Sequence, residues 1–153
     1  MQLGKFTDYG LRVLIQLSAI APEKAPVARI ADRLGLSEHH LAKICSRLVQ
    51  GGFLHSERGR AGGLTLARDA QDIRLGAAIR CLAQETALVE CFAAGDSDCR
   101  LLPLCGVRQP LAEAQEAFYD ALDRYSLADV SQNHAGLRAL LHNDLAQISR
   151  IPP

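Results

Sequence analysis

Residues 26–50 read PVARIADRLGLSEHHLAKICSRLVQ, and this stretch decides the predicted fold. Apolar residues recur at helical spacing in its first part, which predicts a short helix over 26–34. Gly35-Leu36-Ser37 is typical of a tight turn, and Ser37 can cap a second helix over 38–50. A helix, a three-residue turn with glycine and another helix form the helix-turn-helix pattern, although many helical hairpins share this spacing.

The predicted helix over 38–50 has two different faces. Its apolar stripe, at positions i, i+3, i+4 and i+7, consists of Leu41, Ile44, Cys45 and Leu48. The opposite face is polar and basic, and it consists of His39, His40, Lys43, Ser46 and Arg47. A face of this kind on the second helix of the pair suits the major groove of DNA, so its histidines and cations are predicted to contact DNA.

The segment after this helix predicts a β-hairpin. Residues 53–57 and 64–67 have strand character, and residues 58–63 between them read RGRAGG. A hairpin with arginines at its tip, placed after a helix-turn-helix, predicts a winged helix; the alternative is a solvated surface hairpin. In a winged helix, Arg58 and Arg60 would supply charge to DNA phosphates, and the glycines would let the backbone approach them.

Charge is divided unevenly along the chain, although the net charge is zero. Residues 1–68 contain 10 Lys and Arg against 5 Asp and Glu, whereas residues 69–153 contain 7 against 12. A basic first half is expected where one part of a chain meets a polyanion. Chance is the alternative explanation.

The other predicted elements are helices, so the predicted fold class is mainly α with a small β-hairpin wing. Helices are expected over 6–21, 73–83, 109–125 and 134–149. The helix over 109–125 carries a seam with heptad steps, which consists of Leu111, Ala114, Phe118, Ala121 and Tyr125. This seam predicts pairing with a second subunit, and packing within one chain is the alternative. The expected divisions are a winged helix-turn-helix domain (1–83), a cluster-binding loop (84–106), a dimerisation helix region (107–131) and a C-terminal helical extension (132–153).

The composition predicts a globular protein of the cytoplasm. The chain has 153 residues, 48% of them hydrophobic, and no apolar run long enough to span a membrane. Its N-terminus does not have the pattern of a signal peptide, so we expect reduced cysteines. No sequence pattern indicates a substrate pocket or catalytic residues, so an enzyme is not expected.

Three of the five cysteines, Cys91, Cys99 and Cys105, lie within a segment of 15 residues that is rich in turn formers. Their spacing lacks the paired cysteines of common zinc sites, whereas an iron–sulfur cluster normally has four protein ligands. On the residues alone, an iron–sulfur cluster and zinc are equally favoured, ahead of thiols without a metal. Cys45 lies in a predicted buried stripe and Cys81 on the shoulder of a helix, so both are expected to be structural.

Three motifs in order resemble one bacterial family. They are FTDYGLR at 6–12, RGRAGGLTLAR at 58–68, and the cysteine loop with Pro103 before Cys105. With these motifs, over residues 1–131, the chain resembles the winged-helix iron–sulfur regulators. The resemblance is greater to the nitric-oxide-sensing branch, whose Tyr-Ser/Thr-Leu-Ala-Asp motif matches residues 125–129, than to the branch that regulates cluster assembly. Members of the latter carry a histidine where this chain has Arg108.

This resemblance implies a 4Fe-4S cluster on Cys91, Cys99 and Cys105, with 2Fe-2S as the alternative. It also implies that Asp8 of the other subunit is the fourth ligand, a hard carboxylate that leaves one iron open to nitric oxide. From the residues alone, Asp8 is better explained as an acid at the positive end of the first helix.

The function implied by the resemblance is a homodimeric repressor that releases operator DNA when nitric oxide attacks its cluster. An alternative in the same class is a regulator of cluster assembly or a redox-sensing regulator. Alternatives from other classes are a small electron carrier or redox enzyme and a zinc-stabilised DNA-binding protein without a sensing role.

Overall fold

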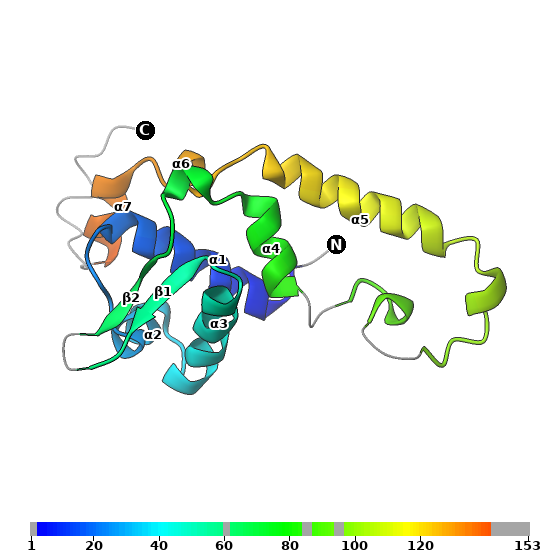
Figure 1. Ribbon diagram of the computed structural model, residues 1–153, viewed down its shortest axis with the longest axis horizontal. Helices are drawn as coiled ribbons and strands as arrows, with labels where there is room; N and C mark the ends of the chain where they lie inside the picture. The colour runs from blue at the N-terminus through cyan, green and yellow to red at the C-terminus, as the bar shows by residue number, and fades with distance from the viewer. Residues whose placement is uncertain (1–2, 60–61, 84–86, 94–96, 142–153) are drawn as a thin grey trace.

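The computed structural model describes residues 3–59, 62–83, 87–93 and 97–141. Its α-helices are α1 (Lys5–Ile20), α2 (Val27–Leu34), α3 (Glu38–Gln50), α4 (Leu75–Ala83), α5 (Arg108–Asp123), α6 (Leu127–Val130) and α7 (His134–Leu141). Strands β1 (Leu54–Glu57) and β2 (Gly63–Leu66) form an antiparallel hairpin, and short 3-10 helices lie at Ala70–Asp72, Glu90–Phe92 and Leu102–Leu104. The predicted class, mainly α with one hairpin, is confirmed (Figure 1). The part of the helix predicted over 134–149 that follows residue 141 lies outside the described residues.

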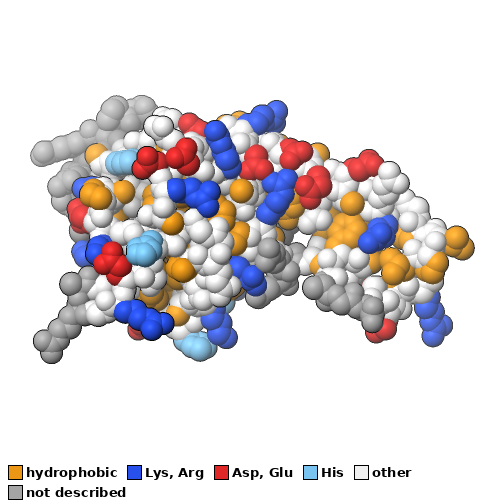
Figure 2. Space-filling view, viewed as in Figure 1, with side chains coloured by type: hydrophobic (Ala, Val, Ile, Leu, Met, Phe, Trp, Pro, Cys, Tyr) orange, Lys and Arg blue, Asp and Glu red, His pale blue; other side chains and the backbone are white. Residues whose placement is uncertain are grey.

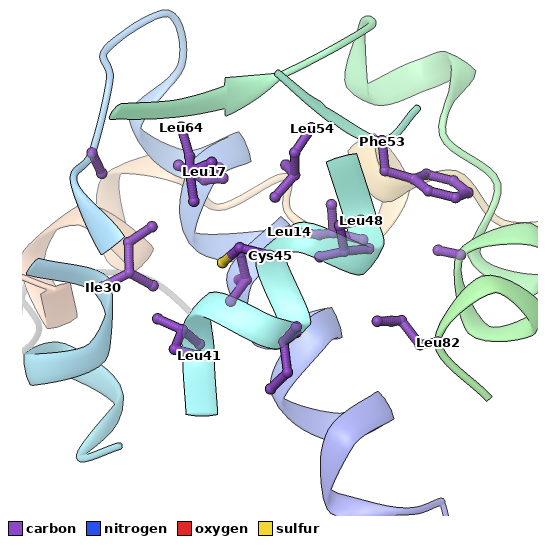
Figure 3. Packing of buried hydrophobic residues seen from close by; sticks show 14 of the residues in the cluster. Leu14, Leu17, Ile30, Leu41, Cys45, Leu48, Phe53, Leu54, Leu64 and Leu82 are labelled. Carbon is purple, nitrogen blue, oxygen red and sulfur yellow. The ribbon is translucent and has the colours of Figure 1, made fainter. Parts of the chain in front are cut away.

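Helix α1 forms the centre of the winged-helix half, and α2, α3, α4, α6, α7 and β2 all contact it. Figure 3 shows Leu14 and Leu17 of α1 in one cluster with Leu41 and Leu48 of α3 and Leu82 of α4. Burial of each leucine side chain contributes about 1.5–3 kcal/mol to stability. The apolar stripe predicted for α3 is therefore confirmed, because it is the side of α3 that packs on α1.

The turn between α2 and α3 follows from its local sequence. Gly35 has a φ of 65°, in the left-handed region that glycine adopts at least cost. The Oγ of Ser37 accepts a hydrogen bond from the backbone N–H of His40 at 3.3 Å, which caps α3. The predicted helix-turn-helix is thus present, with its second helix starting directly after the cap.

The hairpin is attached to the body of the protein at its second strand. In the hairpin, Leu54 lies opposite Leu66 and Glu57 lies opposite Gly63. Leu64 of β2 also exchanges backbone hydrogen bonds of 3.1 and 2.9 Å with Ala25, in the loop between α1 and α2. This attachment fixes the direction in which the hairpin leaves the helices.

Helix α5 extends away from the winged-helix half and carries the cysteine loop to the far end of the molecule (Figure 1). Its attachment is to α4, where Arg80 donates hydrogen bonds to Glu116, Asp120 and Asp123 at 3.0, 3.0 and 2.6 Å. These three carboxylates hold the pKa of the Arg80 guanidinium above its usual range, with Glu116 the largest cause. The joint between α4 and α5 is therefore an ion-pair network of one cation with three acids.

Helix α7 packs against α1 and covers the end of that helix. Arg138 of α7 donates hydrogen bonds to the carbonyl oxygens of Ala19 and Ala21, at 2.6 and 3.3 Å. The two bonds from Arg138 satisfy carbonyls at the end of α1 that have no partners inside the helix. The hydroxyls of Ser18 and Ser131 also form a buried hydrogen bond of 2.8 Å.

Candidate DNA-binding face and cysteine site

The polar face of α3 is turned to solvent, as the two-faced pattern predicted. His39 and Lys43 are exposed, and Arg47 is half-buried. A shallow cavity of about 250 Å³ on this face is lined by Phe6, Lys43, Ser46, Arg47 and Gln50. Sequence reasoning missed Phe6 and Gln50, because only the packing of α1 across α3 brings Phe6 to this surface.

His40 differs from the other residues predicted to contact DNA, because its ring lies against α1. The centroid of the imidazole is 6.4 Å from that of Phe6 and 6.1 Å from that of Tyr9, and both contacts are edge-on. Such edge-to-face pairs are stabilising beyond their area of contact. His40 is therefore part of the joint between α3 and α1, which the sequence pattern did not reveal.

The hairpin carries Arg58 at its tip, and this side chain is exposed. Arg60, its predicted companion, lies outside the described residues. Arg68, at the base of the hairpin, donates to the carbonyl oxygen of Gly52 at 3.2 and 2.9 Å. Glu57, at the end of β1, accepts a hydrogen bond from the ammonium of Lys24, in the loop between α1 and α2, and this contact holds the pKa of the Glu57 carboxyl below its usual range.

The uneven charge of the sequence becomes a spatial separation in the structure. Figure 2 shows acidic side chains gathered along α5. They include Glu116 and Asp120, two of the acids that pair with Arg80. The face of α3 with Lys43 lies in the other half of the molecule, together with Arg58. A polyanion is therefore expected to be attracted to the side with α3 and the hairpin rather than to α5.

The cysteine loop runs from the end of α4 to the start of α5, and its three cysteines are half-buried. Cys91 lies in the 3-10 helix Glu90–Phe92, and Cys105 directly follows the one at Leu102–Leu104. These two cysteines line one cavity of about 950 Å³ with Arg108, Gln115 and other residues at the start of α5. Two of the three predicted ligands are thus brought to the same site.

Cys99 lies in the same loop but does not line this cavity. Its N–H donates to the Ser97 hydroxyl at 3.2 Å, and its carbonyl accepts from the N–H of Leu102 at 3.1 Å. Within the described residues, no three side chains of the metal-binding types are close enough to hold one metal ion. The donor set nevertheless fits an iron–sulfur group in kind, since thiolates are its usual ligands and a wide cavity adjoins two of them.

The two other cysteines have the environment of structural residues. Burial raises the pKa of the Cys45 thiol to about 12, so it stays protonated at neutral pH. The pKa of Cys81 is also raised by burial, and its thiol donates to the carbonyl oxygen of Arg47 at 3.7 Å. A protonated thiol is a poor metal ligand, which agrees with the structural role expected for the buried Cys45 and the half-buried Cys81.

Asp8 lies in the first turn of α1 and faces Arg12 of the same helix. The carboxylate oxygens Oδ1 and Oδ2 lie 3.1 and 2.9 Å from Nε and Nη2 of Arg12, so both are engaged. Asp8 also lines a separate cavity of about 510 Å³, whose apolar walls are Leu3, Tyr9 and Leu36. It does not line the cavity that holds Cys91 and Cys105 of its own chain.

The predicted seam of α5 lies on the side opposite α4. Glu116, Asp120 and Asp123, which hold Arg80, mark the side that faces α4. At 100° per residue, the four seam residues within α5, Leu111, Ala114, Phe118 and Ala121, centre on the reverse side of the helix, whereas Tyr125 follows its end at Asp123. Within the chain, Tyr119 is the fully buried residue of α5, whereas Ala114 in the middle of the seam is exposed. Of the other seam residues, Leu111, Phe118 and Ala121 are half-buried and Tyr125 is exposed, so the seam keeps some exposed surface for a partner.

Comparison with known proteins identifies what this arrangement is similar to. The Rrf2 family, described as an iron-dependent transcriptional regulator, matches residues 3–133. The HTH-type transcriptional regulators NsrR of Geobacillus kaustophilus and Bacillus subtilis are 45% and 39% identical over 142 residues, which cover 92% of this chain and 97% of each relative. The solved structure of T. potens IscR is 25% identical with a TM-score of 0.65, covering 87% of this chain and 88% of that one. No helix among the described residues has the length and apolar character needed to cross a membrane.

Proposed function

Because the chain belongs to the Rrf2 family of iron-dependent transcriptional regulators, we propose that it is a homodimeric repressor whose affinity for operator DNA depends on an iron–sulfur cluster. Cys91, Cys99 and Cys105 would hold this cluster. The observation that carries the proposal is the shared cavity of Cys91 and Cys105 at the start of α5. The protein would regulate transcription rather than catalyse a reaction. It would act in the cytoplasm, where bacterial DNA lies.

In this proposal, α3 and the hairpin bind DNA. The exposed face of α3, with His39, Lys43 and Arg47, would enter the major groove, where side chains reach base edges. Arg58 and Arg60 would contact phosphates, which contributes affinity that does not depend on sequence. His40 would act indirectly, because its ring supports α3 from the side of α1.

Dimerisation through the α5 seam supplies the two recognition helices that paired half-sites require. The seam faces away from α4, and one narrow apolar line per helix is suited to pairing with a second copy. Two α3 helices must lie about 34–36 Å apart to meet successive major grooves on one side of DNA. The rigid joint at Arg80 would transmit the geometry of the seam to these helices.

Asp8 of the second subunit would complete the ligand set as a fourth ligand. Both of its carboxylate oxygens are paired with Arg12, so this role requires the ion pair to open. When bound, the cluster supplies iron with which nitric oxide, the proposed signal, can react. Ligands from both subunits would hold α1 of one subunit to the cysteine loop of the other. Loss of the shared ligand would make the DNA-competent arrangement a minor state.

The test is visible absorbance of protein prepared without oxygen. Cys91→Ala, Cys99→Ala and Cys105→Ala should each lose the absorbance and iron of the wild type, while the matched variants Cys45→Ala and Cys81→Ala keep both. Wild-type absorbance should bleach with nitric oxide, together with a loss of DNA affinity. A colourless wild type that contains zinc would instead favour the zinc-stabilised DNA-binding protein.

A second measurement isolates Asp8. Affinity for DNA is compared between cluster-loaded wild type and Asp8→Ala, with and without nitric oxide and in the absence of oxygen. The variant should retain three thiolates but bind DNA more weakly. Equal affinities and equal responses to nitric oxide would mean that Asp8 serves only the end of its helix.

A further inference from the structure

The cavity beside Cys91 and Cys105 has a cation on its wall that no acid of the described residues pairs with. Arg108 is the one cation among the described residues that line this cavity, and Glu116 is the one carboxylate. The carboxylate of Glu116 accepts a hydrogen bond from Arg80 of α4 at 3.0 Å. The guanidinium of Arg108 forms no hydrogen bond or ion pair within the part of the chain that the structure describes. Its charge is therefore available to a group inside the cavity.

Arg108 also lies where an α-helix disfavours a cation. It is the first residue of α5, at the positive end of the helix dipole, and the first turn contains no acid. The positions three and four residues further, where an acid could pair with it on the helix surface, are Leu111 and Ala112. The neighbouring Gln109 donates to Glu113 at 2.9 Å instead. A negative group that balances Arg108 must therefore come from outside α5.

A metal held by the cysteines is such a negative group. Cysteine thiols lose their protons when they bind a metal. The positive charge of a 4Fe-4S core or of a zinc ion is smaller than the summed charge of three thiolates, so the whole group is anionic. Cys91 and Cys105 line the same cavity as Arg108 and are half-buried. A partly buried anion is stabilised by a cation on the wall of its site.

We propose that Arg108 compensates the negative charge of the metal–thiolate group at this cavity and so slows the loss of the metal. The inference rests on the proposed function, because it requires that Cys91 and Cys105 bind a metal. Arg108 acts by its charge and not as a ligand, since a guanidinium stays protonated and has no lone pair to donate. Its charge would also raise the reduction potential of an iron–sulfur cluster, because that potential depends on the net charge around the cluster.

Three variants separate charge from structure. Arg108→Gln removes the charge and keeps a side chain that suits a helix, whereas Arg108→Lys keeps the charge. Arg108 is exposed, so neither change disturbs the core. Arg124→Gln is the matched control, because Arg124 is an exposed arginine at the other end of α5 and does not line the cavity.

The first measurement is the rate at which anaerobically prepared full-length protein releases its metal to excess EDTA. At an effective dielectric of about 20, a unit charge about 12 Å away changes an equilibrium about tenfold, and a sphere of this cavity's volume is about 12 Å wide. Arg108→Gln should therefore release the metal about tenfold faster than the wild type. Arg108→Lys and Arg124→Gln should release it at close to the wild-type rate.

The second measurement is the reduction potential of the cluster, which a purely structural role of Arg108 would not move. Arg108→Gln should lower it by about 59 mV, the equivalent of a tenfold change in a one-electron equilibrium. Unchanged metal release in Arg108→Gln, or equally fast release in Arg108→Lys, overturns the proposal. A wild type that contains zinc and no iron refutes the iron–sulfur cluster, while the release rates still decide the role of Arg108. A wild type that binds neither metal refutes both.

Discussion

His40 at the start of α3 lies edge-on to Tyr9 of α1, with 6.1 Å between the ring centroids. The same imidazole meets Phe6 at 6.4 Å, so one turn of the recognition helix is supported by two aromatic rings of α1. Arg12 lies 5.7 Å from the Tyr9 ring and pairs with Asp8, so the support is next to the proposed fourth ligand. The angle between α3 and α1 is therefore set close to the site that would sense the signal.

If His40 positions α3 rather than reading bases, its replacement should act through packing. His40→Ala should lower stability by about 1 kcal/mol, the order of magnitude of an aromatic pair, and weaken binding to all DNA sequences alike. His40→Phe keeps a ring at this position, so its affinity for DNA should lie within about twofold of the wild-type affinity. A twofold change corresponds to less than about 0.5 kcal/mol. Thermal unfolding and DNA titration measure both effects. A change of preference at one base pair in the Phe variant would show direct reading instead.

Arg58 should act on DNA affinity through phosphate alone. Arg58→Ala is expected to weaken binding to every duplex and to reduce the slope of log K against log salt by about one unit. Arg60→Ala is expected to do the same. The matched control is Arg124→Ala, an exposed arginine at the end of α5. Titrations at several salt concentrations supply the slopes, and an unchanged slope would remove the hairpin from the DNA surface.

Replacing Lys43 should change which DNA sequences the protein prefers, whereas replacing Arg58 should weaken binding to all of them. If its ammonium reaches a base edge, Lys43→Ala should change sequence preference at one position by about 1–3 kcal/mol. Selection from randomised duplexes with the wild type and the variant measures this preference. Uniform weakening, with the preference intact, would instead assign Lys43 to a phosphate.

Gly76 is required where α4 meets α5. A Cβ at this position would collide with the carbonyl oxygen of Tyr119 and the carboxylate of Asp123. Gly76→Ala should therefore destabilise the protein by about 1–3 kcal/mol, although alanine is the better helix former. Gly106→Ala is the control, because nothing lies within 4 Å of its added Cβ. Chemical denaturation of both variants measures the difference, and equal stability would mean that the joint can open at little cost.

Stability at low pH should depend on Asp129, which forms a capping box with Ser126. The backbone N–H of Ser126, and then its hydroxyl, donate to the carboxylate at 2.8 and 2.7 Å and hold the pKa of Asp129 below its usual range. A depressed pKa means that the contribution is complete above the pKa of the unfolded chain and is lost as the pH falls through the folded value. Asp129→Asn should be less stable than the wild type at pH 7, with the difference shrinking as the pH falls through the folded pKa of Asp129. A difference that persists at low pH would contradict an ionic origin.

The local part of the fold could be predicted because local sequence determines it. The stripe of α3, the Ser37 cap and the glycine of the turn each act within a few residues, so periodicity and residue type suffice. The contacts that orient these elements were not visible in the sequence. Arg80 meets acids about 40 residues away, and Arg138 bonds to Ala19 across 119 positions. No local pattern records such pairings, since they depend on how helices cross.

The chemistry of the candidate site could be predicted from its residue types, but the positions of these residues in space could not. The residue types of the cysteine loop favoured an iron–sulfur cluster or zinc over thiols without a metal, and the structure brings Cys91 and Cys105, but not Cys99, to one cavity. The contacts of His40 with α1 could not be predicted, because a helical wheel records direction and not the neighbouring helix. His40 is exposed, and its ring also meets Phe6 and Tyr9 of α1.

The Arg80 joint also makes α5 a lever. A helix of 16 residues is about 24 Å long, so a turn of about 10° at one end displaces the other by about 4 Å. That displacement is comparable to one base-pair step, about 3.4 Å. If two subunits pair along α5, as proposed, a small change of angle at the Arg80 joint would move a recognition helix by about one step along DNA. The stiffness of the ion pairs between Arg80 and its three carboxylates would determine how much of this motion is transmitted from α5 to the recognition helix.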